Sequence, residues 1–261
     1  MKLSAVTVAF LLLFLALPQA APAEELTGKQ IVEKMKEVES YQDSFMKVNM
    51  ILVNRRGEER QRKLINRMKK FGDQTKTVTT FLYPDDVKGT KFLVEEVKGG
   101  DDIQKLFLPA LDKIRRISSS QKKQSFMGTD FSFGDLQSRD PEKGTHNRVG
   151  EDKMHDHDCY MVESVPAPDS DSEYSKTLSY VRKDNYLPVR VKFFDKDGEQ
   201  VKELHTEDHY LQDGIWMARR TIMMNLRKGS KTILEIVEQK NNSGIKDDFF
   251  SDRFLRAKTQ Y

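Results

Sequence analysis

Residues 154–159 contain side chains that could bind a metal ion. In an extended strand, His155, His157 and Cys159 would point the same way, and imidazole and thiolate groups are good zinc ligands. A structural zinc site usually needs four ligands, however, and the sequence pattern shows no fourth. The simpler interpretation is a polar turn that leads into a strand, in which Cys159 acts as a small buried apolar residue. We therefore expect no metal and no other cofactor, and these three residues remain the metal candidates.

Hydroxyl and carboxylate side chains between residues 118 and 135 could serve catalysis. The serines at 118–120 lack the G-x-S-x-G turn that exposes a nucleophile. Asp130 and Asp135 flank residues 131–134 and could form a carboxylate pair, but Asp and Ser beside Gly are usually turn or cap residues. The sequence also lacks a phosphate-binding glycine loop and a dinucleotide fingerprint. These patterns do not indicate an enzyme.

The most distinctive stretch is residues 106–136, in which two short apolar strands are predicted to precede a polar run. Four large apolar side chains follow in a segment too rich in Gly, Ser and Asp to form a strand: Phe126, Met127, Phe131 and Phe133. Each Phe or Met that is fully buried stabilises a fold by roughly 1.5–3 kcal/mol, so this segment must pack against something.

Two interpretations of this segment remain open. Its aromatic side chains could fill an ordinary core, or the segment could be a mobile lid over an apolar cavity. In the second case Gly128 and Gly134 would supply the backbone freedom for the movement, and Arg115 and Arg116 could contact an anionic head group. Equally, the two arginines could form the solvated face of a strand.

The surrounding sequence predicts one helix and many strands. Residues 26–41 have apolar side chains at helical spacing, with Thr27 and Gln30 in the positions of a capping box. From Ser44 onward the apolar period changes from 3.6 to 2, and turn residues separate the short segments. About ten or eleven antiparallel strands joined by short turns favour a curved sheet or open barrel over a two-layer sandwich. The predicted fold class is therefore mainly β, with an N-terminal helix.

Two of the predicted strands carry side chains that we expect to line the cavity. These side chains are Met46, Val48, Met50, Leu52, Ile222 and Met224. The four apolar residues of the central stretch complete the predicted lining. Methionine side chains on strands suit an adaptable apolar lining. The same residues could equally fill gaps in an ordinary core, because several strands carry apolar side chains on both faces.

The first 23 residues are predicted to be a secretory signal peptide. A positive charge at Lys2 precedes an apolar run at residues 6–17, and Ala21-Pro22-Ala23 forms a cleavage motif. The apolar run is too short for a membrane span of about 20 residues. No cysteine directly follows the cleavage motif, so we expect a soluble chain that begins near Glu24 and carries no lipid anchor. Residues 24–261 are predicted to form a single domain.

The charge balance argues against one class of partner. The full chain has 44 Lys and Arg residues against 41 Asp and Glu residues, and the signal peptide removes only Lys2. Positive and negative charges that are so nearly equal in number argue against a nucleic-acid-binding protein, which would show a one-sided basic surface. Cys159 is the only cysteine, so no internal disulfide can form.

A set of motifs spans most of residues 24–261. These motifs are Phe81-Leu82-Tyr83-Pro84, Lys88-Gly89-Thr90, Leu106-Phe107-Leu108-Pro109-Ala110, Arg115-Arg116-Ile117, the run from Ser125 to Leu136, Cys159-Tyr160 and Leu187-Pro188. In these motifs the chain resembles the periplasmic outer-membrane lipoprotein-sorting proteins, in the branch that is like the Lol carriers. The resemblance implies an unclosed antiparallel β-barrel with an internal hydrophobic cavity and a helical or loop lid. It also implies that the protein is not an enzyme.

The resemblance further implies a periplasmic carrier, which would bind lipid or the acyl chains of lipoproteins and move them towards the outer membrane. Its partners would be those acyl chains and an inner-membrane transporter or exporter. The alternative is a lipid-sensing regulator, or a non-catalytic accessory subunit of an exporter, that uses the same cavity.

Overall fold

The computed structural model describes residues 25–38, 41–137 and 140–258. The predicted signal peptide therefore lies outside the described residues. Of the helices that the structure does describe, none is long and apolar enough to cross a membrane.

One antiparallel sheet contains all thirteen strands of the described residues. The strands are β1 (Asp43–Val53), β2 (Glu59–Phe71), β3 (Gln74–Tyr83), β4 (Lys91–Glu95), β5 (Ile103–Leu108), β6 (Lys113–Arg116), β7 (Thr145–Met154), β8 (His157–Val165), β9 (Lys176–Arg182), β10 (Pro188–Phe194), β11 (Gln200–Gln212), β12 (Ile215–Asn225) and β13 (Ser230–Asn241). Neighbours in sequence are neighbours in the sheet, except that β1 pairs with β13 while β6 and β7 form the two edges. The predicted class, mainly β and unclosed, is confirmed.

The strand count is higher than the ten or eleven that the sequence predicted. Strand β7 is the main reason, because charged and polar side chains occupy most of its positions. It lies at an edge of the sheet and most of its side chains are exposed or half-buried. An edge strand buries little surface, so its sequence needs no apolar alternation.

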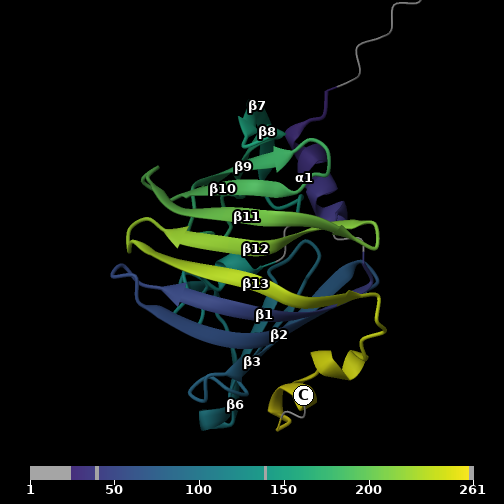
Figure 1. Cartoon of the computed structure of the whole chain (residues 1–261), viewed down its shortest axis with the longest axis vertical. Helices are drawn as coiled ribbons and strands as arrows, with labels where there is room; N and C mark the ends of the chain where they lie inside the picture. The colour runs from purple at the N-terminus through teal and green to yellow at the C-terminus, as the bar shows by residue number, and fades with distance from the viewer. Residues whose placement is uncertain (1–24, 39–40, 138–139, 259–261) are drawn as a thin grey trace, which may run out of the picture.

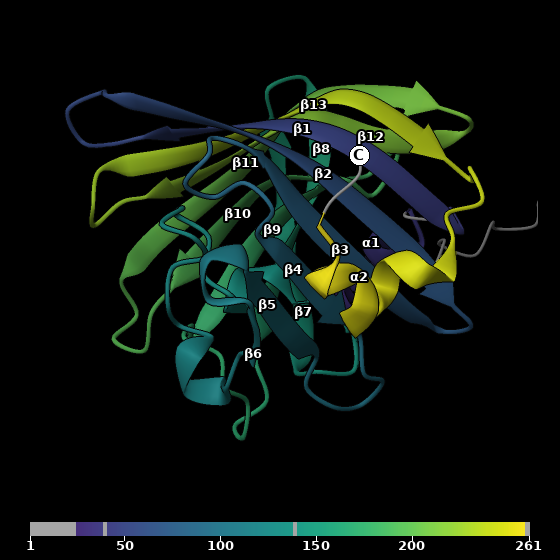
Figure 2. The same cartoon turned by 90° about the horizontal axis from the view of Figure 1, so that it is seen from below.

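The sheet curls into an open half-barrel around the segment that joins its two edges (Figures 1 and 2). This central segment, residues 117–144, contains the short 3-10 turns η2 (Ser119–Gln121) and η3 (Gly134–Leu136). A third turn, η1 (Pro109–Leu111), joins β5 to β6. Because both ends of the central segment are attached to edge strands, the segment must cross the gap where the barrel stays open.

Helix α1 (Gly28–Glu37) closes one part of the concave face. Thr27 caps it, and the capping box with Gln30 is confirmed, although the helix is shorter than the predicted residues 26–41. Ile31 and Val32 are buried against Val162 of β8 and Val181 of β9.

A C-terminal segment, residues 245–257, covers the opposite, convex face of the sheet. It consists of the turn η4 (Asp247–Phe250) and the short helix α2 (Asp252–Arg256), and it lies beside β3 and β6 at the bottom of Figure 1. Phe250 and Leu255 pack against Val78, Leu93 and Phe107. The convex side chain Leu93 lies between the concave ones Phe92 and Val94, so β4 is buried on both faces.

Candidate functional site

The aromatic side chains of the central segment fill the concave face of the sheet. Phe126 and Phe133 are buried against Phe81 and Phe92, with the ring centroid of Phe92 at 4.9 Å from that of Phe126 and 5.6 Å from that of Phe133. Phe131 reaches the other half of the sheet. The central segment therefore contacts strands from both halves of the barrel.

On β1, the predicted lining residues do lie on the face that the central segment covers. Val48 and Met50 are buried in the same cluster as Phe126, and Met46 and Leu52 pack against that cluster. Partly buried Met127 packs there as well. Their role in binding a ligand stays a prediction.

On β12, the predicted face is wrong. Met223, rather than its neighbours, packs against Phe131 together with Val191 and Leu204. Side chains alternate along a strand, so Ile222 and Met224 point to the convex face. The sequence could not separate the two faces here because three consecutive residues of this strand are apolar.

Asp130 ties the central segment to β13. The buried Asp130 carboxylate accepts hydrogen bonds from the hydroxyl of Ser230 at 2.5 Å and from that of Thr232 at 2.9 Å, and its own backbone N–H donates to Thr232 Oγ1. Such bonds to a charged acceptor are stronger than bonds between neutral groups.

Asp135 makes a second attachment, to a different part of the sheet. Its carboxylate accepts from Lys202 Nζ at 2.9 Å and from the Tyr174 hydroxyl at 2.8 Å, and it also caps the backbone N–H of Ser132. Burial and the nearby Asp135 charge raise the pKa of Tyr174 far above its ordinary value, so this phenol stays a donor. Asp130 and Asp135 thus hold separate partners, and the turn-and-cap interpretation describes only part of what Asp135 does.

Two further polar side chains hold main-chain carbonyls of the central segment. Arg62 on β2 donates to the carbonyl oxygen of Met127 at 2.7 Å, and Gln104 on β5 donates to that of Phe133 at 2.7 Å. Sequence reasoning missed both. The available signal was a polar side chain at a position that alternates with apolar concave residues, namely Leu64 after Arg62 and Leu106 after Gln104.

A cavity of about 300 Å³ lies between α1 and the end of the central segment. Its apolar wall comes from Met35 of α1, Met68 of β2, Val94 of β4 and Leu136. Lys36 of α1 and Glu96, which follows β4, also line it, and their ion pair of 2.7 Å joins the helix to the sheet.

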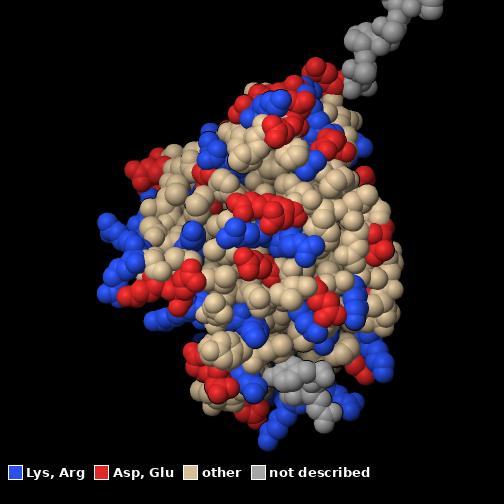
Figure 3. Space-filling model, viewed as in Figure 1, with Lys and Arg blue, Asp and Glu red and all other residues tan. Residues whose placement is uncertain are grey.

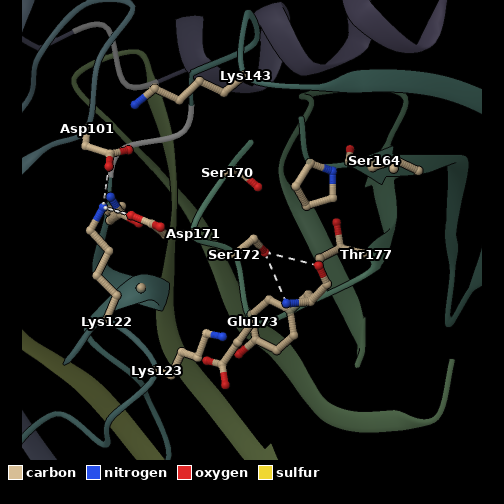
Figure 4. A pocket seen from close by; sticks show the side chains of 15 residues that line it. Asp101, Lys122, Lys123, Lys143, Ser164, Ser170, Asp171, Ser172, Glu173 and Thr177 are labelled. Carbon is tan, nitrogen blue, oxygen red and sulfur yellow. Dashed lines mark hydrogen bonds and ion pairs between the residues drawn. The ribbon is translucent and has the colours of Figure 1, made fainter. Parts of the chain in front are cut away.

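A second cavity, of about 210 Å³, lies on the other side of η3, against β8 and β9 (Figure 4). Lys122 points between Asp101 and Asp171, at 2.9 Å and 3.5 Å from their carboxylate oxygens. Ser172 and the buried Tyr174 line the same cavity. Gln137 lines both cavities, so the central segment separates them.

Arg115 and Arg116 are exposed on edge strand β6. In the register with β5, Arg115 is opposite Leu106 on the concave side and Arg116 is opposite Lys105. Contact with a head group stays a prediction for both.

The metal candidates are not brought together. Cys159 is fully buried with Tyr180 and Val189, and burial raises the pKa of its thiol. His155 lies in the turn before β8 with a φ of 54°, and the His157 ring faces that of His209 at 6.2 Å. Within the described ranges, no three His, Cys, Asp or Glu side chains are arranged to hold a metal ion.

A family model described as "Uncharacterized protein" matches residues 73–257. No curated protein matches the chain. A DUF1329 family protein from Desulfovibrio piger is 32% identical, with a TM-score of 0.84 over 87% of this chain and 97% of that one.

Two further solved structures are similar. A putative outer membrane lipoprotein-sorting protein domain from Vibrio parahaemolyticus is 32% identical, with a TM-score of 0.84 over 88% of this chain and 98% of that one. A LolA superfamily protein from Nitrosomonas europaea is 20% identical, with a TM-score of 0.70 over 88% of this chain and 100% of that one. At that identity the last likeness concerns the fold alone.

Proposed function

The chain belongs to the DUF1329 family and has the fold of a lipoprotein-sorting domain, and from this premise we propose that it is a non-catalytic carrier of acyl chains. The acyl chains, of lipids or of lipoproteins, would occupy the concave face of the sheet. The carrier would work in the periplasm, after removal of the predicted signal peptide, and would move its cargo towards the outer membrane. An inner-membrane transporter or exporter would load it.

One observation carries the proposal: residues without strand structure fill the concave face, and cavities adjoin them on two sides. If the central segment moved outward, the apolar wall of Val48, Met50, Phe81 and Phe92 would become available to an acyl chain. The positive φ of 76° at Gly128, within the aromatic stretch, marks a position where the backbone can turn without a side-chain clash.

The central segment and an acyl chain would occupy the same concave face, and the free energies of burying them there are of the same order. A sixteen-carbon chain gains about 12 kcal/mol at about 0.8 kcal/mol per buried CH₂ group. Releasing three buried Phe side chains costs roughly 5–9 kcal/mol, and each broken hydrogen bond to the charged groups of Asp130, Asp135 or Arg62 costs about 1.5–3 kcal/mol more. The cost of opening is therefore of the same order as the gain, and the acyl chain would bind reversibly, as a carrier requires.

Replacing Phe131 with Ser tests the proposal. Retention of a fluorescent fatty acid should be weakened more than the melting temperature is lowered, because the side chain is needed to close the cavity. Phe249→Ser is the matched control on the convex face, where Phe249 packs against the C-terminal cluster. It should leave retention unchanged. Strong destabilisation of Phe131→Ser with normal retention would mean that the central segment is only core.

Native mass spectrometry of protein purified from the periplasm tests the cargo. A lipoprotein adduct would support transport of lipoproteins, whereas lipid alone would fit both the carrier and a lipid-sensing regulator. Purification without either would contradict both functions.

A further inference from the structure

Six cations surround the edge strand β6 and the neighbouring helix α2. All six are exposed: Lys113, Arg115, Arg116, Arg253, Arg256 and Lys258. The two elements are in contact, because Arg256 reaches the carbonyl oxygen of Asp112 at 3.5 Å and Ile114 packs on the cluster that holds Leu255. Figure 3 shows Lys and Arg side chains projecting from this end of the molecule, below β6 and α2. We call these six residues the edge cations.

The edge cations keep their charge unneutralised. None of them forms an ion pair with any residue that the structure describes, whereas the nearby Lys105 is paired with both Glu95 and Asp252. Asp252 is thereby occupied, and the acidic residues beside it are Asp112 in the β5–β6 turn and Asp85 and Asp86 in the adjacent β3–β4 loop. Because like charges repel one another, binding an external anionic partner would lower the electrostatic energy of this group.

An exposed apolar side chain lies at the tip of the same region. Leu111, in the turn η1 between β5 and β6, is 55% exposed. The adjacent β3–β4 loop lies against this turn, with Gly89 beside the Pro109 ring, and Tyr83 at the start of that loop is 52% exposed. An exposed apolar side chain on the same end of the molecule as exposed Lys and Arg residues suits the boundary between lipid head groups and acyl chains.

We propose that the edge cations and Leu111 form a docking surface for a membrane that contains anionic lipids. Clusters of four to eight Lys and Arg residues bind such surfaces through summed attraction. The cations project on both sides of a protruding edge strand, with Arg115 on its concave side and Arg116 on the other. A deformable bilayer can meet both sides at once, whereas a folded acidic protein would need a groove shaped to this edge. We therefore commit to a lipid surface as the partner.

Co-sedimentation with vesicles tests the proposal directly. The protein should bind vesicles of phosphatidylglycerol and phosphatidylcholine in equal parts and should not bind pure phosphatidylcholine. Replacing Arg115, Arg116, Arg253 and Arg256 with Ala should weaken binding at least about tenfold. The melting temperature should not change, because all four side chains are exposed. Leu111→Ser should weaken binding less, and its effect should persist at high salt.

A matched variant separates this surface from net charge. Replacing Arg55, Arg56, Arg60 and Lys228 with Ala removes the same charge from the exposed ends of the β1–β2 and β12–β13 hairpins, and it should leave vesicle binding intact. Equal weakening by both variants would overturn the proposal, as would no binding by the natural protein. Tighter binding to a polyglutamate peptide than to the vesicles would assign the surface to an acidic protein instead. Vesicle binding does not require the cavity. The docking proposal can therefore fail while acyl-chain retention is observed, and acyl-chain retention can fail while vesicle binding is observed.

Discussion

Two aromatic-rich segments cover opposite faces of the same strands, and they differ in how they are held. The central segment packs Phe126 and Phe133 on the concave face, and the C-terminal segment packs Phe250 and Leu255 on the convex face. All four side chains are nearly completely buried. Burial alone therefore cannot distinguish a movable cover from a fixed one.

The empty space beside the central segment distinguishes the two. The central segment is held by side chains from several strands and has cavities of about 300 and 210 Å³ on its two sides. The C-terminal segment is also held from several strands, by Lys69 of β2, Lys105 of β5 and the buried Lys91 of β4. Lys91 is completely buried and donates to the carbonyl oxygens of Phe254, Leu255 and Ala257 at 2.8, 3.3 and 2.6 Å. We expect the first segment to move and the second to stay in place.

The largest predicted effect is on stability, from Phe250→Ala. Phe250 is buried against the sheet with its ring centroid 5.5 Å from that of Phe71, and truncating a packed Phe costs about 3–5 kcal/mol. Denaturant unfolding should show this loss, while retention of a fluorescent fatty acid per folded molecule stays normal. Loss of retention at unchanged stability would reverse the roles of the two segments.

A smaller loss is expected from Lys91→Met. The substitution keeps an unbranched apolar stem but removes the donor of three main-chain carbonyls, which should cost about 1–3 kcal/mol. Hydrogen exchange should become faster in residues 252–257 and remain unchanged in residues 126–136. Unchanged exchange in the C-terminal segment would show that its apolar contacts suffice to hold it.

Asp130→Asn should affect the central segment with little change in stability. The amide keeps one oxygen acceptor but loses the charge that holds Ser230 and Thr232, a loss of about 1 kcal/mol. Stopped-flow uptake of the fatty acid should become faster, because the cover opens more often. Asp247→Asn is the matched control, since Asp247 is an exposed carboxylate of the C-terminal segment that pairs with Lys69. Equal acceleration by both variants would contradict a specific role for Asp130.

A further prediction is a pH dependence of stability that belongs to the C-terminal segment. Burial lowers the pKa of Lys91 from 10.5 to about 8. The folded protein then releases this proton at lower pH than the unfolded chain, so the free energy of unfolding should rise between about pH 8 and 10.5. The difference in stability between the natural protein and Lys91→Met should grow across that window. A constant difference would show that the three carbonyls offset the burial.

The fold class could be predicted because it depends on local patterns. Alternating apolar residues and short turns specify antiparallel neighbours, and Thr27 with Gln30 marks the start of α1. Strand β7 was missed because an exposed edge strand has no apolar face to detect. The inward face of β12 was missed because Ile222, Met223 and Met224 are all apolar.

The attachments of the candidate site were harder to predict. Asp130 and Thr232 are 102 residues apart, and their hydrogen bond depends on the register of β13 and on the path of a segment without regular structure. Gln104 and Phe133 pose the same problem. A single sequence shows which residues are apolar or polar, but it does not show which distant residues will meet.

The pairing of β1 with β13 has a consequence for how the chain folds. All other strand pairs join sequence neighbours, so each half of the sheet can form from local hairpins. Pairing β1 with β13 instead closes a loop of almost the whole sheet, and such long-range closures form slowly. We expect this step to limit the folding rate. Until it occurs, the half of the sheet that packs Phe126 and Phe133 is not joined to the half that packs Phe131, so the central segment cannot yet bridge the two.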